Sequence, residues 1–418
     1  MVHLRKVMVI GFFVLYAASG LAHADPITNS TQDIDMEDIE RALERDMEAS
    51  SPRGGTADPM QAPVSPRSFA SGPTAGNIFN PDISLITDFA LAAFTTDEPL
   101  QTGAHDPARN GFTLQGVELA LQGVVDPYFR FDTFLNFSEF GVELEEAFAT
   151  TLALPYNLQM RVGQFLTRFG RFNPTHPHDW SFVDQMLVIG KFFGAEANRG
   201  LGVEGSVLLP LPWYVELLAS ATHAHGAATA RSFFGGNDLG VNSPADLQYT
   251  LAAKQFFPLS DHWSLLWGMS AALGPNATGR DNRTDIYGTD VYLKWRPVTS
   301  GPDGRYVALQ AEYLHRARQV PEELLRDDGL YAYLIWQFAQ RWQTGLRQEW
   351  VSGLENDPLD PEWTEQRTRT SGQLTFHPTE FSRLRAQVSY DQPGWRDPYW
   401  GAFLATEFLI GAHGAHKF

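Results

Sequence analysis

The feature that most constrains the fold is a series of short segments in which apolar and polar residues alternate. From Pro81 onward, segments of about ten residues have this period of two and are separated by turn residues. In the segment 129–137, Phe129, Phe131 and Phe137 share one face of a strand, while Arg130 and Asp132 share the other. Strands with one apolar and one wet face, repeated along most of a chain, are typical of membrane β-barrels.

Counting these segments predicts an all-β fold, a transmembrane antiparallel β-barrel of about 16 strands, with a permitted range of about 14–18. An even number agrees with both termini lying on the periplasmic side. The predicted strands are 82–93, 112–125, 128–137, 142–152, 158–167, 201–209, 213–222, 246–255, 263–272, 285–295, 306–315, 329–338, 342–351, 364–376, 382–390 and 401–418.

The connections between these strands support the count, because short turns alternate with longer loops, as they do in outer-membrane barrels. The connections 138–141 and 296–305 depart from the alternation. Aromatic residues such as Trp213 and Trp400 lie near predicted strand ends, which favours a water–lipid boundary there. The predicted longer loops are 94–111, 168–200, 223–245, 273–284, 316–328 and 352–363.

Residues 1–24 have the pattern of a cleaved signal peptide. Arg5 and Lys6 precede an apolar run that is too short for a membrane-spanning helix, and small residues follow at Ala22 and Ala24. Residues 25–80 combine a short amphipathic helix with a linker rich in Pro, Ser and Gly. An oligomerisation stalk and a disordered tail both remain open for this region. The predicted barrel occupies residues 81–418.

The composition agrees with a barrel and excludes several other classes. A hydrophobic content of 43% with a mean hydropathy of −0.24 is compatible with membrane strands, since alternation dilutes their hydrophobicity. The chain has no cysteine, which excludes disulfides and thiolate metal sites. Its net charge of −18 argues against a nucleic-acid partner. We expect no cofactor.

The last predicted strand resembles the C-terminal signature by which outer-membrane barrels are recognised for assembly. It ends in Phe418, and Leu404, Phe408 and Ile410 share one alternating face. His416 departs from the hydrophobic pattern of that signature. The resemblance implies the barrel-assembly machinery as a partner, together with outer-membrane lipid.

Two family resemblances come from internal motifs. Residues 163–170 (GQFLTRFG) resemble the strand-end motif of the phosphate-selective porins O and P. The wider region 77–225 is similar to Gram-negative barrels labelled zinc-regulated or TonB-dependent outer-membrane receptors, through runs such as 80–84, 125–128 and 172–178. About 340 residues are too few for a plug domain and about twenty-two strands, so the resemblance implies the barrel without plugged transport.

The longest predicted connection, 168–200, occupies the place of the loop that narrows the pore in general porins. If it folds inward, its charged residues are candidates for a constriction, because charged rings select ions. A loop that stays outside is the alternative. The constriction-loop candidates are Asp179, Asp184, Lys191, Glu196 and Arg199.

Strand alternation also predicts charged side chains that line the lumen. Arginines on the late strands would form a cationic stripe opposite an acidic wall, and we expect the stripe to favour anions or zwitterions. Salt bridges between neighbouring strands are the simpler alternative. The pore-lining candidates are Arg347, Arg367, Arg369, Arg383 and Arg385 for the stripe, and Glu118, Asp132, Glu143 and Glu145 for the wall.

Paired histidines form the remaining motif with chemical potential. His176 and His178 have a spacing that suits zinc, with Asp179 as a third ligand, although such pairs also arise by chance. A similar pair stands at His223 and His225. We find no catalytic motif and expect no enzyme activity.

The function predicted from the sequence is passive diffusion of small hydrophilic solutes or ions through the outer membrane of a Gram-negative bacterium, with a homotrimer as the expected assembly. A substrate-specific or zinc-related uptake channel is one alternative. A structural or enzymatic barrel with a closed pore is another.

Overall fold

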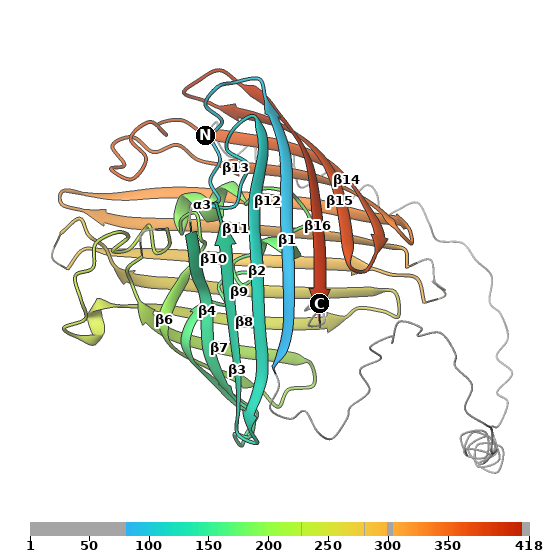
Figure 1. Ribbon diagram of the computed structural model, residues 1–418. Helices are drawn as coiled ribbons and strands as arrows, with labels where there is room; N and C mark the ends of the chain where they lie inside the picture. Colours follow the sequence, from blue (N-terminus) through green and yellow to red (C-terminus); the bar gives the residue numbers. More distant parts are fainter. Residues whose placement is uncertain (1–80, 140, 227, 280, 299–303, 412–418) are drawn as a thin grey trace, which may run out of the picture. The chain divides into compact units, whose positions relative to one another are not determined.

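The computed structural model describes residues 81–418, apart from 140, 227, 280, 299–303 and 412–418. Sixteen antiparallel strands form a closed barrel, in which consecutive strands pair and β1 pairs with β16 (Figure 1). The predicted fold class is therefore confirmed. The strands are β1 (Asp82–Phe94), β2 (Gly111–Asp126), β3 (Phe129–Ser138), β4 (Gly141–Thr151), β5 (Leu158–Leu166), β6 (Arg199–Leu208), β7 (Tyr214–His223), β8 (Leu247–Pro258), β9 (Trp263–Pro275), β10 (Arg283–Trp295), β11 (Tyr306–Val320), β12 (Glu323–Ala339), β13 (Trp342–Val351), β14 (Arg367–Thr379), β15 (Ser382–Pro393) and β16 (Tyr399–Gly411).

The period of two explains why these segments form a barrel. On β8, the Leu251 side chain is exposed on the outer surface, whereas Gln248 and Thr250 are buried inside. Closure of the sheet gives each backbone N–H and C=O a partner on a neighbouring strand, which a hydrocarbon environment requires. The apolar outer faces are thus suited to lipid, and polar chemistry collects in the interior.

One predicted loop is wrong. Residues 316–328 were expected to form a long connection, but β11 and β12 continue through them and Val320 pairs with Glu323. The charged residues in this stretch obey the same alternation, since Arg316 and Arg318 are buried inside the barrel. These arginines have acidic partners in the interior. The polar residues of this stretch therefore belong to strands and do not indicate a loop.

Short helices occur in the connections. The α-helix α3 (Leu187–Phe192) and the 3₁₀ turn η1 (Pro177–Asp179) lie between β5 and β6, and the 3₁₀ turn η2 (Pro244–Asp246) precedes β8. In the part of the chain that the structure describes, no helix has the length and apolar character needed to cross a membrane.

Several predictions fall on residues outside the described part. They concern the signal peptide at 1–24, the helix and linker at 25–80, and the terminal Phe418.

Candidate functional site

Residues 167–198, called here the inward segment, connect β5 to β6 and fold into the barrel, as expected for 168–200. Helix α3 is buried along its whole length and packs against β12 and β13 (Figure 1). The Glu312 carboxylate on β11 accepts hydrogen bonds from the backbone N–H groups of Arg171 (2.8 Å) and Phe172 (2.6 Å). The segment therefore contacts strands on the far side of the barrel from its own attachment points.

Apolar packing holds part of the inward segment. Phe169, Phe192 and Phe193 are completely buried and belong to one cluster with Phe233, from the loop after β7, and Leu314 on β11. Each large apolar side chain removed from water in this way contributes roughly 1.5–3 kcal/mol. The space between α3 and the neighbouring strands is thus packed as a hydrophobic core.

The five arginines of the predicted cationic stripe face the interior, and the inward segment contacts four of them, Arg347, Arg369, Arg383 and Arg385. Asp184 of that segment makes ion pairs with Arg347 (2.6 Å) and Arg369 (2.9 Å). All three side chains are at most 1% exposed. Burial disfavours the Asp184 carboxylate, but the two guanidinium groups outweigh burial and lower the pKa of Asp184 to about 2.

The remaining arginines of the stripe also have partners. Arg383 and Arg385 both donate to the Trp180 carbonyl oxygen, at 3.0 and 3.1 Å. Arg367 pairs with Asp391 on the neighbouring strand at 2.7 Å. These guanidinium groups therefore form salt bridges within the barrel and anchor the inward segment.

The acidic wall faces the histidines of the inward segment. His176 Nδ1 lies 3.1 Å from both Glu118 Oε2 on β2 and Glu145 Oε2 on β4, and His178 Nδ1 lies 3.3 Å from Glu118 Oε2. Burial disfavours charged imidazoles, but the carboxylates outweigh it. They raise the pKa of His178 to about 9 and that of His176 well above its ordinary value. The structure thus places both members of the predicted histidine pair against two predicted wall residues.

Two members of this cluster were missed by the sequence analysis. A β-bulge between Phe134 and Leu135 shifts the register opposite β4, so the adjacent Glu145 and Glu146 are both buried inside. Strict alternation had placed only Glu145 there. His105, in the loop after β1, is the other missed residue, and a single loop histidine carries no spacing signal. Burial lowers the pKa of His105, but its hydrogen bonds with Glu145 and Glu196 outweigh burial and raise that pKa well above the ordinary value.

The constriction-loop candidates do not form one ring. Asp184 anchors the segment as described, Lys191 pairs with Asp327 on β12 at 3.1 Å, and Arg199 pairs with Glu143. Glu196 lies 3.5 Å from His105 Nε2, and Asp179 lines a cavity beneath the segment. Most of these charges therefore fasten the segment to the wall.

That cavity, of about 1180 Å³, lies between the inward segment and the short-turn end of the barrel. Its lining reaches Gln343, close to the turn between β12 and β13. Both signs of charge occur on its walls, where Asp132 pairs with Arg130 at 2.7 Å and Lys254 pairs with Asp290 at 3.1 Å. The barrel thus contains a polar chamber on one side of the segment.

Comparison with known proteins gives one sequence relative and a clear fold. No protein-family model matches the chain. An uncharacterized protein of Aquifex aeolicus (strain VF5) is 32% identical over 394 residues, which cover 84% of this chain and 82% of the relative. The outer membrane channel DcaP of Acinetobacter baumannii has a TM-score of 0.55 and 11% identity, over 79% of this chain and 97% of DcaP.

Two further solved structures have the same fold. Pseudomonas putida OprB has a TM-score of 0.52 and 11% identity, over 79% of this chain and 94% of OprB. The anion-selective porin from Comamonas acidovorans has a TM-score of 0.51 and 8% identity, over 79% of this chain and 99% of the porin. The fold is therefore that of porin-like outer-membrane barrels. Neither the phosphate-selective porin resemblance nor the TonB-dependent receptor resemblance is supported by these comparisons.

Proposed function

The chain belongs to the same family as the uncharacterized Aquifex aeolicus protein, and from its porin-like barrel we propose that it is an outer-membrane channel for passive diffusion of small hydrophilic solutes or ions. The observation that carries this proposal is the inward segment, held across the lumen next to a polar chamber. A Gram-negative outer-membrane location, homotrimeric assembly and insertion through the barrel-assembly machinery are parts of the same proposal.

The chamber has the size and lining that a small polar solute needs. Its volume of about 1180 Å³ exceeds the roughly 300–1,000 Å³ of pockets that hold drug-sized molecules. Paired charges and amide side chains offer hydrogen bonds to a solute without one dominant sign of charge. In this proposal the inward segment forms the narrowest point, and its position decides which solutes pass.

The ion preference remains a prediction. Arg367, Arg369 and Arg385 are at most 5% exposed and have acidic or carbonyl partners, so their charges act on ions mainly through the position of the segment. Reversal potentials in planar bilayers, measured for the wild type and for the three Arg→Ser variants, test an anion preference. Conductance recorded in the same experiment separates lost selectivity from a displaced segment.

Planar-bilayer recording of single channels tests the proposed function. We would compare the wild type with a variant in which a short Gly/Ser linker replaces residues 177–195. Heat-dependent migration in gels would establish that both barrels fold. We expect discrete conductance steps from the wild type and larger steps from the variant, because the narrowest point is removed. If only the variant gave conductance steps, the wild-type barrel would be closed, which would contradict passive diffusion.

A further inference from the structure

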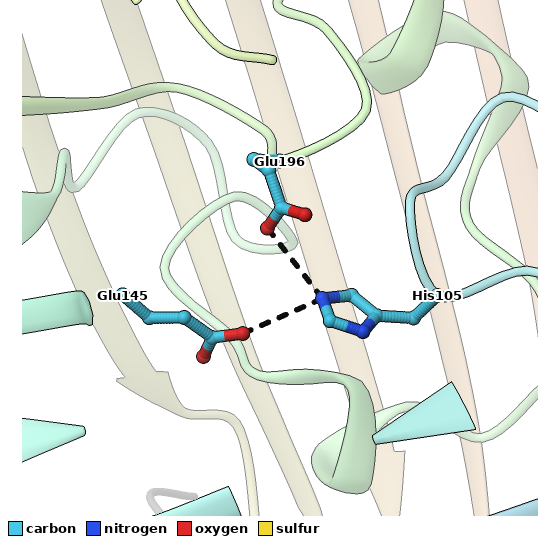
Figure 2. Close-up of side chains that lie close together, drawn as sticks. All are labelled: His105, Glu145 and Glu196. Carbon is cyan, nitrogen blue, oxygen red and sulfur yellow. Dashed lines mark ion pairs between the residues drawn. The ribbon is translucent and has the colours of Figure 1, made fainter. Parts of the chain in front are cut away.

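Histidines and glutamates gather where the inward segment and the loop after β1 meet the wall formed by β2 and β4. Figure 2 shows His105 with its ring between the carboxylates of Glu145 and Glu196. On the other side of Glu145 lies the ring of His176. These side chains come from four separate stretches of the chain; that of His105 is 11% exposed, and those of Glu145, Glu196 and His176 are at most 9% exposed.

The distances around His176 suit a shared metal ion. His176 Nδ1 lies 3.1 Å from one oxygen each of Glu118 and Glu145, and His178 Nδ1 lies 3.3 Å from that same Glu118 oxygen. Ligands at about 2.0–2.1 Å from a tetrahedral ion are roughly 3.3 Å apart. One imidazole nitrogen, from His176, and two carboxylate oxygens, from Glu118 and Glu145, therefore lie close enough to share an ion, since these three ligand atoms are within 4.8 Å of one another. His178 adjoins this group at Glu118.

The far ring nitrogens have the partners that metal-bound histidines require. His176 Nε2 lies 2.8 Å from Glu146 Oε2, and His105 Nδ1 lies 2.8 Å from the Gln115 carbonyl oxygen. A carbonyl oxygen accepts hydrogen bonds, so His105 Nδ1 carries the proton and donates. Such outer partners fix the ring and direct the other nitrogen at the metal. In both histidines that other nitrogen points toward carboxylates.

Glu145 connects two groups of ligands. Its Oε2 faces His176, while its Oε1 lies 3.4 Å from His105 Nε2, which in turn lies 3.5 Å from Glu196 Oε2. In each group, one ligand atom from every residue lies within 4.8 Å of the others. A carboxylate that presents one oxygen to each group is placed to bridge two cations.

Two buried oxygens beside these groups have no hydrogen-bond partner among the described residues. They are Glu118 Oε1 and Asn136 Oδ1, and both side chains are at most 9% exposed. A buried polar atom without a partner costs roughly 1–3 kcal/mol. A bound cation with its remaining water ligands would satisfy such atoms.

Charge points to a cation as well. The cluster contains four carboxylates, from Glu118, Glu145, Glu146 and Glu196, and three imidazoles. Even with each imidazole protonated, these groups keep an excess of one negative charge. The contacts between these imidazoles and carboxylates, and a bound metal ion, are alternative ways to hold the same carboxylates.

We propose that this cluster binds a divalent transition-metal cation of the zinc class, with Glu118, Glu145 and His176 as protein ligands and water in the remaining position. Through Glu145, the site extends to a second centre at His105 and Glu196. Mixed imidazole and carboxylate ligands suit zinc better than magnesium or calcium, which prefer oxygen alone. This proposal does not depend on the proposed transport function. A bound cation would join the inward segment to the barrel wall.

Isothermal titration of Zn²⁺ into the full-length, detergent-folded, chelator-treated protein tests the site. We expect saturable binding that excess Mg²⁺ does not displace. Glu145→Gln and His176→Gln should abolish it, and Glu146→Gln, which removes an outer partner, should weaken it by about 10–100-fold. The matched control changes both His223 and His225 to Asn, because this half-buried pair has the same spacing. It should leave binding unchanged.

X-ray absorption of the zinc-loaded wild type keeps the test valid if a variant fails to fold. We expect a nitrogen and oxygen shell with the outer scattering of at least one imidazole. The proposal would be overturned if the wild type gave no heat of zinc binding. It would also be overturned if the Glu145 and His176 variants still bound zinc, or if the His223/His225 control alone lost zinc binding. A shell without imidazole would overturn it too.

Discussion

At the scale of single residues, Asp184 joins the inward segment to three strands, β13, β14 and β15. It contacts Arg347 and Arg369, and it accepts a hydrogen bond of 2.7 Å from Gln387. Strand alternation predicted that these arginines face inward, and loop charge made Asp184 a candidate. Their pairing was beyond sequence reasoning, because 163 residues separate Asp184 from Arg347 and periodicity carries no information on such contacts.

Replacing Asp184 by Asn should release the inward segment. The change removes one of the two carboxylates that pair with Arg347 and Arg369 and leaves them Glu349, at 3.0 and 2.7 Å. Breaking a buried pair costs about 3–5 kcal/mol, and the remaining carboxylate places the expected cost at the lower end. We expect faster amide hydrogen exchange in peptides that cover α3. The control is Glu139→Gln, since Glu139 and Arg109 form an exposed pair worth roughly 0–1 kcal/mol. Equal exchange in both variants would argue against the anchoring role.

At the scale of elements, the strands were predictable, whereas the helix within the inward segment was not. Alternation located all sixteen strands. It failed at β4, where the bulge turned Glu146 inward, and between β11 and β12, where charged residues continue the strands. The six residues of α3 are too few to show helical periodicity, and tertiary packing rather than propensity makes them helical.

Docking of α3 should depend on pH, because the pKa values of two buried loop aspartates, Asp106 and Asp184, are shifted in opposite directions. The Gln185 N–H donates to Asp106 at 2.8 Å. Burial, followed by the charge of Asp184, raises the pKa of Asp106 to about 6. A raised carboxyl pKa costs stability as pH rises from about 4 through 6, whereas the lowered pKa of Asp184 gives stability that is lost between about 4 and 2.

The urea midpoint, followed by near-ultraviolet circular dichroism, should therefore rise from pH 7 to about 4 and fall from there to about 2. Asp106→Asn should make the rise smaller and keep the fall. A midpoint that declines steadily from pH 7 to 4 in the wild type would be inconsistent with these shifts.

At the scale of the whole molecule, the protein is a closed barrel with an apolar cluster around α3 and a polar chamber on the short-turn side of the inward segment. The sequence predicted the barrel, because each strand carries its own pattern. It predicted inward folding only from loop length and position. The contacts that hold the segment join residues far apart in the chain, so only the assembled barrel reveals them.

A disulfide between α3 and the barrel wall can form only if the inward segment lies inside the barrel. A Cβ added at Gly329 on β12 would lie 2.8 Å from the Val188 Cβ, so a small shift reaches the roughly 3.5–4.5 Å of a disulfide. The chain has no cysteine, so Val188→Cys with Gly329→Cys introduces the two thiols alone. The control pairs Val188→Cys with Gly372→Cys, whose added Cβ has nothing within 4 Å.

The measurement is the fraction of cross-linked protein after mild oxidation in outer-membrane vesicles, determined by mass spectrometry. We predict nearly complete cross-linking for the Val188–Gly329 pair and none for the control. Free thiols at both positions in the folded Val188–Gly329 variant would show that α3 does not lie against β12.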